Sequence, residues 1–162
     1  MKSAASVFLL ARLLFAPPAA VPAQAAVAAV LDDWHAAAAA ADEPRYFRHF
    51  APDAVFLGTD GTERWTVEEF RRYAHPYFVT GRAWSFKPVG RHIAISPDGS
   101  VAWFDEALDT PNLGPARSSG VLVRIKKVWK IAHYDLSVPI PNDLMKEIKE
   151  RIEAHGKAAP PR

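Results

Sequence analysis

The hydrophobic periodicity of the chain changes near Gly81, and this change limits the fold more than any other feature of the sequence. Before Gly81, apolar side chains recur at helical spacing over residues 26–41 and again after Thr66. Beyond it, apolar and polar residues alternate, which is typical of strands with one buried face. Helices gathered at the start and strands gathered later predict an α+β domain.

Two short elements separate the first and third helices. Pro44 suits a first helical position, and a short aromatic helix is predicted from there to about Pro52. The β-rich run 54–58, the turn at 60–61 and the segment 63–65 then predict a hairpin.

The third helix has both of its ends marked in the sequence. Thr66 and Glu69 stand at capping-box spacing, so each side chain can bond a backbone N–H of the first turn. Pro76 is predicted to interrupt this helix, and Gly81 is predicted to end it.

The second half of the domain is predicted to be an antiparallel meander. Alternating strands are expected over residues 84–95, 101–108, 119–126 and 129–138, joined by short connections. Pro88 marks a bulge or an edge position in the first of them, because proline cannot donate to a sheet ladder. Short connections between consecutive strands favour antiparallel pairing.

A last helix is expected after Pro141, with Asn142 as its N-cap and Gly156 as its stop. Its apolar side chains form one narrow stripe, and its polar face mixes acids with bases. We therefore expect this helix to dock on the domain or on a second copy rather than on a membrane. The stripe consists of Leu144, Met145, Ile148 and Ile152.

Residues 1–25 have the layout of a secretory signal peptide. Lys2 provides a basic start, residues 7–15 an apolar run, and residues 23–25 an Ala-Gln-Ala cleavage pattern. Removal of this leader leaves a secreted or periplasmic protein with one domain over 26–143 and a helix with a disordered tail over 144–162. The alternatives are a start codon assigned too early or an Ala/Pro-rich tail.

Composition excludes several classes of function. The chain has no cysteine, which excludes disulfides, thiolate catalysis and iron–sulfur or zinc–cysteine sites. The chain has 20 basic and 18 acidic side chains, and Lys2 and Arg12 of the predicted leader account for the difference. The remaining chain is formally neutral, which does not favour binding to nucleic acid. No nucleotide or metalloprotease motif is present, and the 6 histidines stand at no metal-ligand spacing, so we expect neither a cofactor nor a metal.

Asp105 and His133 are the catalytic candidates. Strand alternation places Asp105 on one face with Trp103, and His133 on one face with Ile131. A polar group among apolar neighbours suits a pocket, where desolvation raises the pKa of a carboxyl toward that of a useful general base. The alternatives are an Asp105 that faces solvent or pairs with Arg117, and a His133 whose hydrogen bonds are satisfied in the core.

Five further residues are ligand-binding candidates. Asp60 lies in a polar turn between aromatic residues, although an Asp before Gly is first of all favourable turn chemistry. Tyr77 stands where the third helix is expected to loosen, while the other aromatic side chains of the helical half are assigned to the core. Arg117 is placed to bind an anionic ligand group or an acid on the next strand. Trp103 and Tyr134 adjoin the two catalytic candidates.

The order of these elements resembles the SnoaL-like branch of the nuclear transport factor 2-like superfamily. The similarity covers residues 26–143 and is most specific in the Gly-Thr-Asp segment at 58–60 and the Trp-Lys-Ile-Ala-His run at 129–133. It implies a cone, in which a strongly curved, mostly antiparallel sheet wraps around the helices and leaves an apolar pocket at its open end. It also implies a homodimer formed through the sheet face.

The same resemblance leaves the function open, because the family includes isomerases, cyclases, dehydratases and hydrolases beside members that only bind ligands or assemble complexes. Our leading hypothesis is an exported domain that binds a small hydrophobic or aromatic molecule. The second is an isomerase- or lyase-type enzyme in which Asp105 and His133 transfer protons on a carbonyl compound. The third is a non-catalytic dimeric assembly module.

Overall fold

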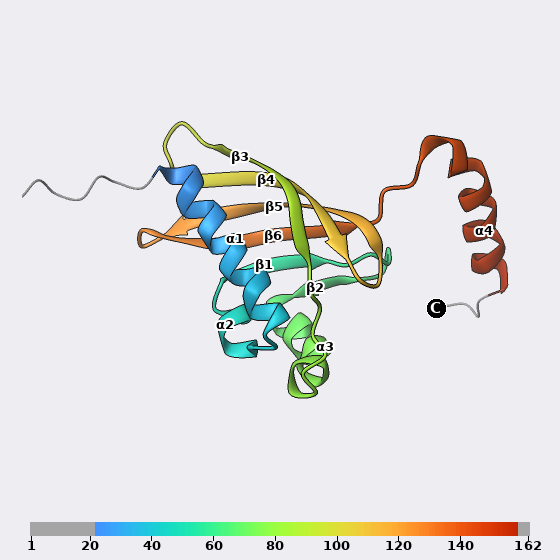
Figure 1. Ribbon diagram of the computed structural model, residues 1–162, viewed down its shortest axis with the longest axis horizontal. Helices are drawn as coiled ribbons and strands as arrows, with labels where there is room; N and C mark the ends of the chain where they lie inside the picture. The colour runs from blue at the N-terminus through green and yellow to red at the C-terminus, as the bar shows by residue number, and fades with distance from the viewer. Residues whose placement is uncertain (1–21, 159–162) are drawn as a thin grey trace, which may run out of the picture.

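One six-stranded sheet carries the fold and curves around three helices (Figure 1). The computed structural model describes residues 22–158. The helices are α1 (Ala23–Ala39), α2 (Glu43–Phe47), α3 (Val67–Val79) and α4 (Met145–Ala158), with a 3-10 turn η1 (Asn142–Leu144) before the last. The strands are β1 (Phe50–Leu57), β2 (Arg64–Thr66), β3 (Lys87–Ile95), β4 (Val101–Thr110), β5 (Gly114–Ile125) and β6 (Val128–Ser137). The predicted α+β class is confirmed.

The strands follow the order β2-β1-β6-β5-β4-β3 across the sheet. Strands β3 to β6 are consecutive in the chain and antiparallel, so the predicted meander is confirmed. Strand β1 runs parallel to β6 and antiparallel to β2, which places the predicted hairpin beside the last strand. Strand β3 lies at the edge, and its register shifts between Pro88 and Gly90, as the proline predicts.

The capping box at the start of α3 is confirmed. The Thr66 hydroxyl accepts from the Glu69 N–H at 3.3 Å, and the Glu69 carboxylate accepts from the Thr66 N–H at 2.9 Å. The predicted interruption at Pro76 is wrong, because this exposed proline lies near the end of a helix that continues to Val79. Gly81 follows with φ of +68°, a conformation that glycine adopts without a Cβ clash.

The first two helices differ from the prediction at their ends. Helix α1 spans Ala23–Ala39 rather than residues 26–41. Helix α2 ends at Phe47 rather than near Pro52, because Phe50 already pairs with β6 in the sheet. Long-range strand pairing therefore sets the end of α2, and this end cannot be predicted from local helix propensity.

The core lies between the concave face of the sheet and helices α1 to α3. Trp34 of α1 packs edge-on against Tyr134 of β6, with 4.6 Å between ring centroids, and stacks on Tyr46 of α2 at 5.0 Å. Phe56 of β1 stacks on Phe70 of α3 at 3.9 Å. Aromatic pairs therefore join each of these helices to the rest of the core. The expected core placement is confirmed for Tyr46, Phe47, Phe50 and Phe78 and is wrong for Tyr73, which is 44% exposed.

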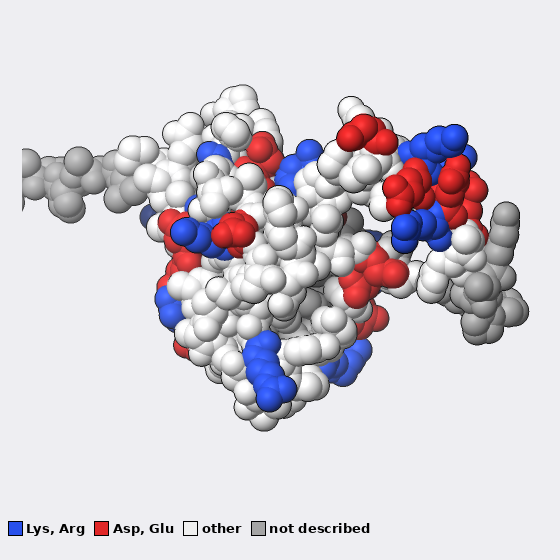
Figure 2. Space-filling view, turned by 45° about the vertical axis from the view of Figure 1, so that its right-hand side comes forward, with Lys and Arg blue, Asp and Glu red and all other residues white. Residues whose placement is uncertain are grey.

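Helix α4 stands apart from the domain at the end of an extended link over residues 138–141 (Figure 1). Most of its predicted apolar stripe is exposed, so the expected docking on this domain is wrong, and docking on a second copy stays a prediction. Asn142 does not cap α4, since it lies three residues before the helix as the first residue of the 3-10 turn η1, and Gly156 lies inside α4. Figure 2 shows acidic and basic side chains interspersed on this helix, as predicted.

The predicted leader falls largely outside the described residues, because residues 1–21 precede them. The predicted cleavage pattern at residues 23–25 forms the start of α1. No helix within residues 22–158 is both long and apolar enough to cross a membrane.

Candidate functional site

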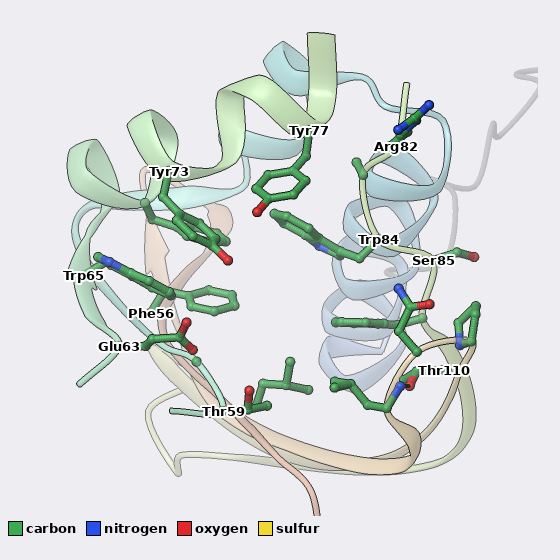
Figure 3. A pocket seen from close by; sticks show the side chains of 18 residues that line it. Phe56, Thr59, Glu63, Trp65, Tyr73, Tyr77, Arg82, Trp84, Ser85 and Thr110 are labelled. Atoms are coloured by element: carbon green, nitrogen blue, oxygen red, sulfur yellow. Dashed lines mark hydrogen bonds between the residues drawn. The ribbon is translucent and has the colours of Figure 1, made fainter. Parts of the chain in front are cut away.

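A cavity of about 410 Å³ opens between α3, the β1–β2 hairpin, the segment before β3 and the loop between β4 and β5 (Figure 3). Aromatic side chains are the largest group in its wall, beside aliphatic residues and a set of polar residues, Thr59, Glu63, Arg82, Ser85, Thr110 and Asn112. The aromatic members are Phe56, Trp65, Phe70, Tyr73, Tyr77, Trp84 and Phe86.

The β1–β2 hairpin and α3 hold the aromatic wall in place. Strand pairing sets Phe56 opposite Trp65, and the capping box at Thr66 starts α3 directly after β2. Helix α3 then lays Tyr73 on Trp65, with 4.7 Å between ring centroids. Tyr77 follows one turn later on the same side of the helix. Both tyrosine rings extend from α3 toward the cavity in Figure 3.

Glu63 supplies the carboxylate of the cavity wall. The Gly58 N–H donates to the Glu63 carbonyl at 2.9 Å, and the Asp60 N–H donates to the Glu63 side chain at 3.1 Å. A Cβ on Gly58 would overlap the Glu63 carboxylate, so glycine leaves the space that this side chain occupies. The hairpin therefore fixes the position of the acid.

The Tyr73 hydroxyl lies beside other polar groups of the cavity. Burial raises the pKa of Tyr73, and the neighbouring Tyr77 hydroxyl and Glu63 carboxylate raise it further. Tyr73 therefore stays protonated at neutral pH and can donate a hydrogen bond. The cavity combines a carboxylate acceptor and two phenol hydroxyls with a largely apolar wall.

Two of the predicted site residues lie at this cavity or beside it. Tyr77 lines the cavity and is 43% exposed. Asp60 lies in the adjoining hairpin turn, where its carboxylate accepts from the Thr62 N–H at 2.8 Å. The predicted turn role of Asp60 is therefore confirmed, while the ligand-binding roles of both residues stay predictions.

Trp103, Asp105 and Arg117 lie on the outer face of the sheet and do not line the cavity, so their predicted placement in a pocket is wrong. Trp103 and Asp105 do share a face, but a period of two residues does not say which face is buried. The Asp105 carboxylate lies 3.1 Å from His92 on β3 and not against Arg117. With 61% of its side chain exposed, Asp105 lacks the desolvation that the general-base hypothesis requires.

A bulge in β6 reverses the faces predicted for His133 and Tyr134. The register between β5 and β6 shifts beside Ala132, which stays unpaired. Strand alternation therefore moves by one residue after Ile131, so His133 turns to the outer face and Tyr134 turns inward. Tyr134 is fully buried in the aromatic core and does not line the cavity. The prediction that Asp105 and His133 face one pocket is wrong.

Sequence reasoning does not identify Glu63 or Trp84 as cavity residues. A signal for Glu63 exists, because it stands two residues before Trp65, and a period of two places such residues on the same side of an extended chain. No comparable signal exists for Trp84, since residues 82–86 belong to no helix or strand. Only the folded chain brings this segment across from α3.

A second polar centre, which the sequence does not predict, lies in the interior beneath α1. The fully buried Glu106 carboxylate lies 2.7 Å from His35 Nε2 and 2.7 Å from Arg91 Nε. It also accepts from the Ser118 hydroxyl at 3.0 Å, and Arg91 bonds Asp32 at 2.7 Å. These contacts compensate a buried charge, and none of the five residues lines the cavity. We call this group the Glu106 cluster and assign it to the stability of the fold.

The part of the chain that the structure describes holds no group of three or more His, Asp or Glu side chains that could bind a metal ion. The chemistry that the cavity itself offers includes apolar contact with the rings, hydrogen bonding by the tyrosines and a carboxylate acceptor at Glu63.

The family model described as the SnoaL-like domain matches residues 27–141. The chain belongs to the SnoaL-like family. The predicted resemblance is therefore confirmed, and the matched region of the SnoaL-like domain includes all six strands and the cavity but not α4. Comparison with curated proteins finds no match.

Solved structures of the nuclear transport factor 2-like (NTF2-like) group share this fold. An NTF2-like protein of unknown function from Pseudomonas putida is 15% identical, with a TM-score of 0.64 over 75% of this chain and 89% of that one. A proposed dehydratase of the NTF2-like family from Streptomyces avermitilis is 13% identical, with a TM-score of 0.62 over 72% of this chain and 96% of that one. A proposed calcium/calmodulin-dependent protein kinase II association domain from Xanthomonas campestris is 25% identical, with a TM-score of 0.56 over 78% of this chain and 94% of that one.

Proposed function

We propose that this SnoaL-like domain binds a small hydrophobic or aromatic molecule in the aromatic cavity. The supporting observation is a cavity of about 410 Å³ with seven aromatic side chains in a wall that also holds polar groups. Ligand pockets in proteins measure roughly 300–1,000 Å³ and combine an apolar wall with a few orienting polar groups. Tyr73 and Tyr77 remain 44% and 43% exposed, so their rings present apolar surface that a ligand can cover.

Equilibrium titration with 2-naphthol, a neutral aromatic alcohol, tests this function. We expect saturable one-site binding, weakened about tenfold in Tyr77→Ala because the variant removes one ring of the wall. Val79→Ala is the matched control, since Val79 lies on the same helix, is 69% exposed and does not line the cavity. Absence of saturable binding to the wild type, or an equal loss in both variants, contradicts the proposal.

We propose as well that the chain is exported and loses residues 1–25. The first fully buried side chain of α1 is Val27, and the family match begins at the same residue, so cleavage after Ala25 leaves the buried part of the helix intact. The denatured mass of the protein recovered from cells that carry the full gene tests this proposal. We expect a chain that begins at Ala26, and an uncleaved chain in the cytoplasm contradicts it.

We further propose a homodimer formed through the outer face of the sheet. Trp103, Val121, His133 and Val55 form a row in register across four strands of this face. Trp103 is 50% exposed, and an exposed aromatic ring in a row with two valines favours a partner surface. The similarity to a proposed association domain from Xanthomonas campestris agrees with assembly.

A further inference from the structure

The charge at the cavity is uneven. Glu63 and Arg82 are the acid and the base among the 18 residues that line it. Glu63 is half-buried and its carboxylate faces the space between the rings, whereas the Arg82 guanidinium points away from the cavity (Figure 3). The interior of the cavity therefore carries a negative charge.

The Glu63 carboxylate is held in place without a cationic partner. Its hydrogen bond from the Asp60 N–H, at 3.1 Å, involves one oxygen, and within residues 22–158 the carboxylate forms no ion pair with Lys, Arg or His. Gly58 gives the side chain room, and the hairpin fixes its base. A carboxylate that is partly removed from water gains most from a partner of opposite charge.

The aromatic wall has the electrostatic character that a cation prefers. The face of an aromatic ring is negative, and a cation within about 6 Å of a ring centroid is attracted to it, most strongly by tryptophan and tyrosine. Trp65, Tyr73, Tyr77 and Trp84 all contribute to this wall. Trp65 and Tyr73 stack at 4.7 Å, and Tyr77 lies 5.6 Å from Tyr73, so several rings surround one space beside Glu63.

The geometry points to an organic cation as the ligand of this cavity, an ammonium or quaternary ammonium group carried on an apolar or aromatic body. This inference rests on the proposed binding function and specifies its ligand class. The rings contact the alkyl groups and the positive charge together, and Glu63 supplies the counter-charge. A neutral ligand of the same shape makes the same apolar contacts but leaves the carboxylate unpaired.

Two isosteric probes test the inference. Phenyltrimethylammonium and tert-butylbenzene have nearly the same shape and differ by one positive charge. We measure the affinity of each by displacement of bound 2-naphthol, and we expect the cation to bind about tenfold more tightly. In Glu63→Gln this preference is reduced, because the counter-charge is lost while the rings remain, and the affinity for tert-butylbenzene is unchanged. Glu68→Gln, an exposed acid on α3, is the matched control and keeps the preference.

The outcomes separate the inference from the function on which it rests. If the two probes displace 2-naphthol equally well from the wild-type protein, the cation inference is overturned and the binding function stands. If 2-naphthol itself does not bind, both are overturned. A preference of undiminished size in Glu63→Gln overturns the assigned role of the carboxylate. The comparison of the two probes on the wild type needs no variant, so it holds even if Glu63→Gln folds poorly.

Discussion

Two neighbouring acids on β4 show how different the two faces of this sheet are. Glu106 faces the interior, is fully buried and contacts His35, Arg91 and Ser118. Asp105 faces outward, has 61% of its side chain exposed and contacts His92 at 3.1 Å. An acid enters the interior only where the fold supplies partners, whereas an acid on the outer face needs none. Neighbouring positions of one strand therefore hold an acid that lies at the surface and an acid that contributes to the structure of the interior.

Burial and pairing act in opposite directions on Glu106. Burial alone raises the pKa of a carboxyl, but the His35 contact and the Arg91 charge outweigh it, so the pKa of Glu106 lies below its ordinary value. Glu106 is therefore a buried carboxylate in the folded protein, and its contacts with His35 and Arg91 stabilise that form. This difference between the inner and outer faces leads to four predictions.

The largest effect is expected from removal of the buried acid. Glu106→Ala leaves Arg91 and His35 without their interior partner, and we expect it to lower the free energy of unfolding by about 3–5 kcal/mol. Asp105→Ala is the matched control one residue away and should change it by less than about 0.5 kcal/mol. Urea unfolding of both variants measures the difference.

Glu106→Gln provides a second measurement that does not depend on purifying Glu106→Ala. It keeps the size of the side chain, loses the charge and should still cost more stability than Asp105→Asn. Equal stabilities for the variants at positions 105 and 106 would contradict the claim that the two faces of the sheet differ.

The second prediction concerns packing on the inner face at Gly120 of β5. A Cβ at this position would overlap the His133 carbonyl and come within 2.8 Å of the Phe104 ring. We expect Gly120→Ala to lower the free energy of unfolding by about 1–3 kcal/mol, because the ring and the backbone must shift. Gly90→Ala on β3, where nothing lies within 4 Å of the added Cβ, is the control. Similar unfolding curves for the two variants would show that the inner face is loosely packed.

The third prediction is the acid sensitivity of the buried acid. Because the folded pKa of Glu106 is lowered, the unfolded chain takes up this proton at a higher pH than the folded protein does. The stability from Glu106 is therefore present above the ordinary carboxyl pKa of about 4.3 and is lost as the pH falls through the folded value. In urea unfolding between pH 6 and pH 3, wild type should lose stability more steeply than Glu106→Gln, by at most about 1.4 kcal/mol per pH unit. Parallel profiles would contradict the role of this charge.

The smallest effect on stability is expected at Trp103 on the outer face. Trp103→Ser should change the free energy of unfolding of one chain by less than about 0.5 kcal/mol, because half of this residue is already in water. If the sheet face forms the dimer, the same variant halves the mass measured by light scattering. Val79→Ser, an exposed change on α3, should leave the mass unchanged. A wild-type mass of one chain would overturn the dimer proposal.

Local signals account for most of the elements and for few of the site residues. The capping box at Thr66, the hairpin and the four meander strands each depend on residues close together in the sequence, and all are present in the fold. The predictions fail where distant contacts intervene, as with Phe50, which pairs with β6, and with the bulge at Ala132. That single bulge moves His133 out of the interior and Tyr134 into it.

The α+β class, the antiparallel order of the last four strands and, in a strand without a bulge such as β4, the residues that share a face all follow from neighbouring residues and are predictable from the sequence. Which face of a strand is buried depends on contacts with distant parts of the chain. Glu106 meets His35 and Arg91, which lie 71 and 15 residues away in the chain, and such partners are invisible to strand periodicity. The cavity depends on distant segments in the same way, since α3, the hairpin and residues 82–86 enclose it only after the sheet has curved around the helices.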